Sequence, residues 1–234
     1  GKTLAFGLPI LTMIRPEGRL PQVLVVLPTR ELALQVREAI NGVQPDGPLR
    51  IVTVFGGVGL EPQERALRAG ADIVVGTPGR LKDLLGRRSL DLSRVHLLVL
   101  DEADQMLDMG FRRDIEFLVR QLPARQQTII FSATMPDPIL AIAEQHMKNP
   151  VRLVAQSGET IPRLIVHQFV RTGRATRVED LLALLQAARP ERAIVFTQMK
   201  HETRRVAEKL QKLGGLDVAF LNGNMSQGAR LTAL

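Results

Sequence analysis

At 234 residues, the chain has room for one large domain or two small ones. It contains no cysteine, which excludes a disulfide framework and a thiolate metal site, and no apolar run approaches the roughly 20 residues of a membrane-spanning helix. The net charge of +7 and the absence of a visible signal peptide lead us to expect a cytoplasmic protein with a polyanionic partner and no membrane association.

The excess of positive over negative charges is larger in the later, shorter part of the sequence. There are 19 Lys and Arg against 17 Asp and Glu in residues 1–155, and 12 against 7 in residues 156–234. With no Trp, no Tyr and eight Phe, the chain has few side chains on which bases could stack. A nucleic acid would therefore be bound mainly through its phosphate backbone.

A candidate phosphate-binding motif opens the sequence. Gly1-Lys2-Thr3 precedes a helical pattern of apolar residues over Leu4–Ile14. At the start of a helix, GKT is the end of a Walker A loop, in which Lys contacts the β- and γ-phosphates and Thr holds Mg²⁺. The helix N-terminus would favour the same anion. Three residues are a weak signal, and an unrelated Gly-Lys-Thr sequence is the alternative.

Short apolar segments then alternate with helical patterns. Strands are expected at residues 23–27, 51–55, 73–75, 95–100 and 128–131, and helices at residues 31–40, 61–69, after Arg80 as far as Gly86, 109–121, and from Asp137, which would cap the last of them. This alternation predicts a parallel sheet in an α/β fold. The carboxyl ends of parallel strands meet at one edge of the sheet, where ligands bind.

Four of these strands run into loops rich in glycine, proline and polar residues. The loops are Pro28-Thr29-Arg30, Gly56-Gly57, residues 76–80 (GTPGR) and residues 132–134 (SAT). A glycine pair lets the backbone approach a ligand closely, although an ordinary turn is the alternative.

The central predicted strand ends at two carboxylates. Residues 95–104 read VHLLVLDEAD, so a strand that is apolar on both faces stops at Asp101-Glu102. Adjacent carboxylates at the end of a parallel strand can hold a divalent cation and an activated water. The alternative is that Asp101 only caps the helix that follows.

A second, shorter part follows a polar segment at residues 156–163, which we interpret as a linker. Beyond it, the apolar patterns predict strands at residues 164–170, 193–196 and 218–221, and helices at residues 178–188 and 202–213.

A faint repeat relates the two parts. Thr29 and Thr197 each follow an apolar strand and precede a helix, and Gly56 and Gly223 come at nearly the same distance further on. We therefore expect a duplicated α/β domain, with the first copy over residues 1–155 and the beginning of the second over residues 164–234.

The motifs occur together and in one order. From the start of the chain they are Gly1-Lys2-Thr3, residues 28–35 (PTRELALQ), Gly56-Gly57, residues 77–80 (TPGR), residues 101–104 (DEAD) and residues 132–134 (SAT). This ordered set resembles the DEAD-box family of ATP-dependent RNA helicases, over nearly the whole chain. Phe196-Thr197 and residues 227–230 look like the first motifs of the family's second domain. The resemblance implies two RecA-like parallel-sheet domains in tandem, the second incomplete, with ATP between them and RNA across both.

The resemblance also implies roles in ATP hydrolysis. Gly1 and Lys2 would contact the phosphates of ATP. Thr3 and Asp101 would hold Mg²⁺, and Glu102 would orient or activate the attacking water. Lys2, Asp101 and Glu102 would thus be the catalytic residues. The activity implied is ATP hydrolysis coupled to local unwinding of RNA duplexes or remodelling of RNA–protein complexes.

Further residues would bind RNA, single-stranded or duplex, through its phosphate backbone. The implied RNA-binding residues are Pro28, Thr29, Arg30, Gly57, Thr77 and Arg80 in the first domain and Thr197 and Arg230 in the second. Ser132 and Thr134 would couple the nucleotide state to the RNA.

Several family features fall outside the sequence or differ within it. The start of the Walker A loop, the upstream adenine-reading motif and the last motifs, which carry arginine fingers, are absent, so we expect an internal fragment with poor ATPase activity by itself. Asn222 and Asn224 stand where the family often has His and Asp. Two other functions are left open: a related DNA helicase, and a non-catalytic RNA-binding module in which Asp101 and Glu102 are structural.

Overall fold

The computed structural model describes residues 2–16, 18–44, 47, 49–154, 165–173, 175–225 and 227–233. The chain divides into two compact units, residues 1–152 and 153–234, and each is described by itself. The predicted linker at residues 156–163 and the predicted phosphate ligand Gly1 lie outside the described residues.

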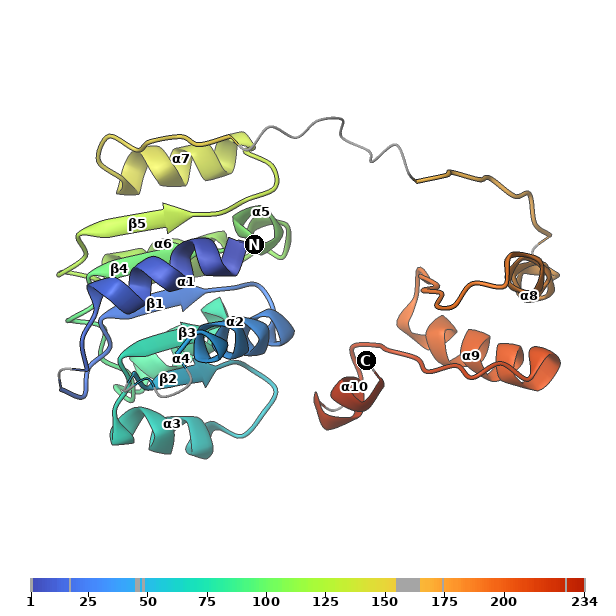
Figure 1. Cartoon of the computed structure of the whole chain (residues 1–234), viewed down its shortest axis with the longest axis horizontal. Helices are drawn as coiled ribbons and strands as arrows, with labels where there is room; N and C mark the ends of the chain where they lie inside the picture. The colour runs from blue at the N-terminus through green and yellow to red at the C-terminus, as the bar shows by residue number, and fades with distance from the viewer. Residues whose placement is uncertain are drawn as a thin grey trace. The chain divides into compact units, whose positions relative to one another are not determined.

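A five-stranded parallel sheet forms the centre of the first unit, in the order β2-β3-β1-β4-β5 (Figure 1). The strands are β1 (Val23–Val26), β2 (Ile51–Val54), β3 (Ile73–Gly76), β4 (Leu97–Leu100) and β5 (Gln127–Ile130). All five predicted strands are confirmed, with ends that differ by one or two residues. In β1, Val25 pairs with Val75 of β3 and with Val99 of β4. These three strands are buried along their whole length, as their uninterrupted apolar sequences predict.

Helices cover both faces of this sheet. They are α1 (Lys2–Met13), α2 (Arg30–Gly42), α3 (Leu60–Ala69), α4 (Pro78–Gly86), α5 (Ala103–Asp108), α6 (Arg112–Arg120) and α7 (Asp137–His146). Because side chains alternate along a strand, Val25 belongs to the core that includes residues of α1 and α2, whereas Leu24 belongs to the second core, which includes residues of the remaining five helices. Figure 1 shows α1 and α2 on the same side of the sheet. Because all five strands of this sheet are parallel, each of them runs into a loop at the same rim.

Two helix predictions need correction. The helix predicted at residues 109–121 begins only at Arg112, and the separate helix α5 precedes it. Gly110, at a φ of +80°, divides them, because this left-handed conformation ends a helix and suits glycine. Asp137 is the first residue of α7 and not its cap. Pro136 holds the cap position, and no side chain of the described residues caps this helix.

The second unit contains α8 (Arg177–Ala188), α9 (Lys200–Gly214) and α10 (Gln227–Ala233). Helices α8 and α9 are linked by an ion pair between Lys209 Nζ and Glu179 Oε1 at 3.3 Å. In the described part of this unit, only Ala207 and Leu210 are buried apolar residues.

The strands predicted at residues 164–170, 193–196 and 218–221 are wrong for the described residues, none of which is in a strand there. Phe169 is 98% exposed and Phe196 is 91% exposed. An apolar pattern shows that a segment tends to be buried, but a strand also needs a hydrogen-bonded neighbour. No such pairing forms in the part of this unit that the structure describes. In the described part of the whole chain, no helix is both long and apolar enough to span a membrane.

Candidate active site

Asp101 lies directly after β4 and is buried. Its backbone N–H donates to Val26 O of the neighbouring strand at 3.0 Å, and its Oδ1 accepts from Glu102 N at 3.0 Å. Burial raises the pKa of the Asp101 carboxyl, while the Glu102 hydrogen bond and the positive charge of Lys2 oppose this change. The fold therefore brings Lys2, from the start of the chain, within electrostatic range of the carboxylate at the end of β4.

Glu102 has a left-handed backbone, with φ 52° and ψ 50°, and it precedes the first residue of α5. This conformation costs a non-glycine residue about 1 kcal/mol, and such strain is concentrated at functional sites. The alternative that Asp101 caps the following helix is wrong, because Glu102 is the cap residue. Among the described residues, no side chain makes a capping bond at this helix start. The Glu102 carboxylate is therefore not used by the helix and is half-exposed at the rim.

Asp104 connects the DEAD motif to the loop after β5. Its Oδ2 accepts hydrogen bonds from both the backbone N and the Oγ1 of Thr134, each at 3.0 Å, and its own N–H donates to Ser132 Oγ at 3.2 Å. Burial acts to raise the pKa of Asp104, but the hydrogen bonds from Thr134, Ser132 and Gln105 outweigh it and lower the pKa. The two predicted coupling residues thus meet at one carboxylate.

Asp104 is a site residue that sequence reasoning missed. It lies within the DEAD motif, but no role followed from its position in the sequence. Its partners Ser132 and Thr134 are 28 and 30 residues away. Only the adjacency of β4 and β5 in the sheet brings them together.

The start of α1 lies beside the same part of the rim. Within this helix, the Phe6 ring packs against the Phe131 ring at the end of β5, with 5.6 Å between centroids. Lys2 is exposed and Thr3 is half-exposed in the first turn, which carries no acidic residue. A helix N-terminus without acidic side chains suits an anion. We call this region the acidic half of the rim: Lys2, Thr3, Asp101, Glu102, Asp104, Ser132 and Thr134.

The other half of the rim is formed by the loops after β1, β2 and β3, and we call it the basic half: Pro28, Thr29, Arg30, Gly57, Thr77 and Arg80. Thr29 caps α2 through its Oγ1, which accepts from Leu32 N at 3.3 Å. The Arg30 guanidinium lies directly against Gly57, whose φ is +74°. A Cβ at Gly57 would overlap this guanidinium, and the positive φ is a conformation that favours glycine.

Arg80 and Thr77 join the loops after β2 and β3. Arg80 Nη2 donates to Val58 O at 3.2 Å, and the N–H of the buried Thr77 donates to Val54 O at 3.0 Å. The Arg80 side chain is only 11% exposed. Its Nη1 is buried and has no hydrogen-bond partner among the described residues. One donor of this guanidinium is therefore uncompensated. Pro28, in the loop after β1, is buried.

Gln63 of α3 is a second residue that sequence reasoning missed as part of the site. It is 8% exposed, and its Oε1 accepts from Phe55 N at 2.9 Å. Its Nε2 donates to Phe55 O at 3.2 Å and to Gly59 O at 3.0 Å. One buried amide thus holds the loop that contains Gly57. The available signal was a glutamine on the apolar face of an amphipathic helix, close after the glycine pair.

The remaining predicted residues belong to the second unit. Thr197 Oγ1 donates to Met199 O at 3.2 Å just before α9, and Arg230 is half-buried in α10. Asn222 Nδ2 donates to Thr203 Oγ1 at 3.2 Å. Thr197 and Arg230 are described within this unit alone, and their role in RNA binding stays a prediction.

The parallel sheet, its helix-covered faces and the functional rim define the first unit as an α/β protein of the RecA-like class. The model of the DEAD/DEAH box helicase family matches residues 1–142. The chain therefore belongs to the DEAD/DEAH box helicase family.

Individual proteins show the same relationship. The chain is 41% identical, over its whole length, to the DEAD-box ATP-dependent RNA helicase CshA of Streptococcus pneumoniae, and it covers 44% of that protein. It is 45% identical over 231 residues to the ATP-dependent RNA helicase DeaD of Escherichia coli, covering 98% of this chain and 37% of that protein. The chain thus spans less than half the length of these relatives.

A solved structure is also similar. The crystal structure of a DEAD box protein from the hyperthermophile Methanococcus jannaschii matches with a TM-score of 0.64 and 33% sequence identity. The match covers 99% of this chain and 62% of the archaeal one.

Proposed function

We propose that the chain is part of an RNA helicase in which ATP hydrolysis drives local unwinding of RNA duplexes or remodelling of RNA–protein complexes. The observation that carries the proposal is the Asp101-Glu102 pair at the end of β4, with Lys2 within electrostatic range and Glu102 held in a left-handed conformation. CshA and DeaD are both named ATP-dependent RNA helicases, which supports the same function. A cytoplasmic location is part of the proposal.

For the nucleotide, we assign Lys2 and the N-terminus of α1 to the phosphates of ATP, together with Gly1. Thr3 and Asp101 would hold Mg²⁺, which when bound neutralises phosphate charge. The residues fit this ion, because a buried carboxylate with a raised pKa is stabilised by a nearby cation. Among the described residues, no group of three or more His, Cys, Asp or Glu could hold a metal. Mg²⁺ needs only one or two protein ligands beside phosphates and waters.

In hydrolysis, Glu102 would orient the attacking water and accept its proton. Phosphoryl transfer depends mainly on positioning and charge stabilisation, and a fixed left-handed backbone is a means of positioning. The loss of the γ-phosphate would be sensed through Asp104, because Ser132 and Thr134 are both hydrogen-bonded to it.

For RNA, the basic half would bind the phosphate backbone. The support is the uncompensated Nη1 of Arg80, the close approach that Gly57 permits, and the position of Arg30 against it. Thr197 and Arg230 would add contacts from residues 164–234, which we propose as the N-terminal part of a second RecA-like domain after a linker at residues 156–163.

The proposal is tested by Glu102→Gln in the full-length protein. We expect RNA-stimulated ATP turnover to fall by about a hundredfold or more while ATP affinity changes less than threefold, because only the water-orienting carboxylate is removed. The matched control is Glu61→Gln, which removes an exposed carboxylate from α3. An equal loss of ATP binding and turnover would instead make Glu102 structural.

The choice between RNA and DNA is tested with the same protein. We expect single-stranded RNA to stimulate ATP turnover at least about tenfold more than DNA of the same sequence, because the 2′-hydroxyl distinguishes the two. Equal stimulation by DNA would favour the DNA helicase, and no turnover with either would favour the non-catalytic RNA-binding module.

A further inference from the structure

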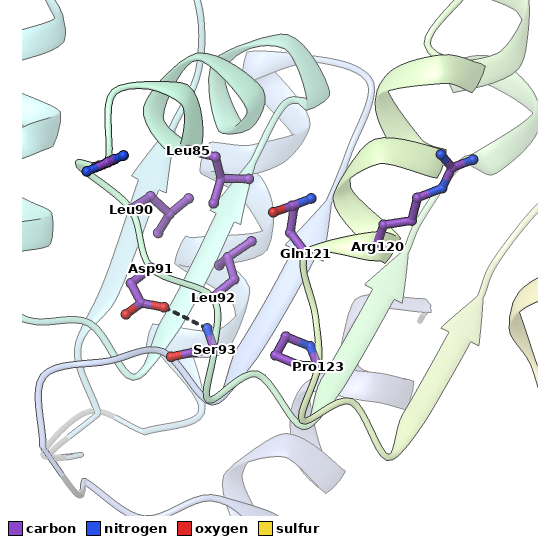
Figure 2. A pocket seen from close by; sticks show the side chains of 9 residues that line it. Leu85, Leu90, Asp91, Leu92, Ser93, Arg120, Gln121 and Pro123 are labelled. Atoms are coloured by element: carbon purple, nitrogen blue, oxygen red, sulfur yellow. Dashed lines mark hydrogen bonds between the residues drawn. The ribbon is translucent and has the colours of Figure 1, made fainter.

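Two adjoining hollows lie at the amino ends of the strands, opposite the rim that carries the candidate active site. The larger, of about 560 Å³, is formed by the segments that lead into β4 and β5, and the smaller, of about 120 Å³, by those that lead into β1 and β3. They share Arg88, Leu90 and Asp91. In the larger hollow, Leu85, Leu90 and Leu92 gather on one side and face Gln121 and Pro123 across it (Figure 2).

Four exposed arginines surround these hollows: Arg19, Arg68, Arg88 and Arg120. Within the part of the chain that the structure describes, none of their guanidinium groups forms an ion pair or a hydrogen bond. By contrast, the neighbouring Arg87 pairs with Asp83 at 2.7 Å. Among the residues that line the hollows, Asp91 is the single acid, and its Oδ1 already accepts from Ser93 N at 2.8 Å. The surface is therefore strongly cationic.

Arg88 occupies a backbone position that favours glycine. Its φ is +58°, and the turn that ends α4 has the two hydrogen bonds of a Schellman motif, Ser89 N to Leu84 O at 2.9 Å and Arg88 N to Leu85 O at 3.0 Å. Glycine is the usual residue at this position, and arginine there costs about 1 kcal/mol. The chain therefore places a long cationic side chain at the junction of the two hollows against the local backbone preference.

We propose that the two hollows bind an acidic peptide segment of a partner protein. One apolar side chain of this segment fills the larger hollow against Leu85 and Leu90, and flanking Asp and Glu residues pair with the four arginines. Charge complementarity selects an acidic partner, and an apolar anchor in a pocket gives it affinity. An RNA backbone matches the charge but has no apolar group for the leucines, and no aromatic residue lines either hollow for base stacking.

The same arginines have a second physical effect. Arg120 lies in the last turn of α6 and Arg88 follows the end of α4, and cations at helix C-termini are stabilising. This effect predicts a change in stability on substitution, but it predicts no peptide binding. Stability and binding therefore have to be measured on the same variants.

The experiment titrates the full chain with a fluorescein-labelled peptide, EEDLFDEE, and follows fluorescence anisotropy. We expect saturable binding, with an affinity that falls about tenfold or more in Arg88→Glu/Arg120→Glu. The matched control, Arg65→Glu/Arg112→Glu, reverses two exposed arginines that lie away from the hollows and should change the affinity less than twofold. A peptide with Ser in place of Leu and Phe should bind at least about fivefold more weakly.

Two further measurements make the result decisive. Circular dichroism and thermal unfolding show whether each variant is folded. If Arg88→Glu/Arg120→Glu is not folded, the milder variant Arg88→Gln/Arg120→Gln replaces it in the titration. In NMR spectra, the peptide should shift the amide signals of Leu90, Ser93 and Gln121. The proposal is overturned if the peptide does not bind, or if the two charge-reversal double variants lose peptide binding equally. It is also overturned if the binding of a single-stranded oligouridylate depends on Arg88 and Arg120 while the binding of the peptide does not.

Discussion

The two halves of the carboxyl rim are held in place by different interactions. In the acidic half, charged groups make the contacts, and Asp101 and Asp104 have pKa values shifted in opposite directions by burial and by hydrogen bonds. In the basic half, the loops are held chiefly by the neutral hydrogen bonds of Gln63, together with the bond from Arg80 to Val58 O and the contact between Arg30 and Gly57. The acidic half is thus held mainly through a charged carboxylate, whereas the basic half is held mainly through one neutral amide and a close contact.

The largest stability effect is expected from Gln63→Leu, which tests whether shape in the basic half depends on one amide. The change leaves the buried Phe55 N–H without its partner and removes the bonds to Phe55 O and Gly59 O. We expect a loss of about 3 kcal/mol in the free energy of unfolding, measured by urea denaturation. The control Gln35→Leu, at an exposed site on α2, should change it by less than about 0.5 kcal/mol. Equal effects would show that Gln63 does not hold this loop.

A smaller effect is expected from Arg30→Gln, which tests the basic half in RNA binding. The proposed contact of Arg30 with a phosphate would be lost, so affinity for RNA should fall by about 1.5 kcal/mol and the slope of log affinity against log salt should fall by about one unit. Titrations at several salt concentrations with RNAs of different sequence measure both. Arg65→Gln, on the exposed face of α3, is the control and should leave the slope unchanged. An unchanged slope for Arg30→Gln, or strong sequence preference, would contradict backbone binding.

In the acidic half, Asp104→Asn should destabilise the fold by about 1 kcal/mol, because Thr134 loses a charged acceptor. The pKa of Asp104 is lower in the folded than in the unfolded chain. The ionised carboxylate therefore stabilises the folded state fully at pH values above the unfolded-state pKa of about 3.9. This stabilisation disappears as the pH falls through the folded-state pKa. Thermal unfolding of the unchanged protein and of Asp104→Asn between about pH 7 and pH 3 should show that their difference in stability becomes smaller in acid. A stability difference that does not change with pH would exclude the charge of Asp104 as its cause.

Asp101→Asn is expected to have the smallest effect on stability, with the opposite sign. Burial raises the pKa of Asp101 in the folded state. At pH values above this folded-state pKa, the ionised carboxylate therefore lowers the free energy of unfolding. The destabilisation disappears when the pH falls below the pKa of the same group in the unfolded chain. The variant should be about 0.5 kcal/mol more stable near neutral pH, with no advantage in acid. The control Glu38→Gln, at an exposed site on α2, should show no such pH dependence. A less stable Asp101→Asn would mean that the acidic half is held by this carboxylate too.

The elements of the first unit could be predicted because their signals are local. Uninterrupted apolar runs such as Val23–Val26 and Leu97–Leu100 are buried on both faces, and their alternation with helices implies parallel pairing. The rule that ligands gather at the carboxyl ends of such strands then correctly located Asp101, Glu102 and Thr77 at one rim.

The partners within the rim could not be predicted, because they depend on the order of the strands. Asp104 meets Thr134 because β4 and β5 are neighbours, and Arg80 meets Val58 because β2 and β3 are neighbours. Each side chain has the chemistry for many partners, and the sequence pattern does not select one of them.

By itself, the sequence of this protein determined the α/β class, the five strands of the first unit and the residue types at their ends, since periodicity and motif spacing are properties of a short segment. Only the tertiary structure decided which carboxylate is stabilised by hydrogen bonds, that Gln63 holds the loop of Gly57, and that the apolar segments around Phe169 and Phe196 form no strands in the described residues. The physical reason is the same in each case. A hydrogen bond or a strand pairing needs a second group brought close through space, and the fold of the whole unit supplies it.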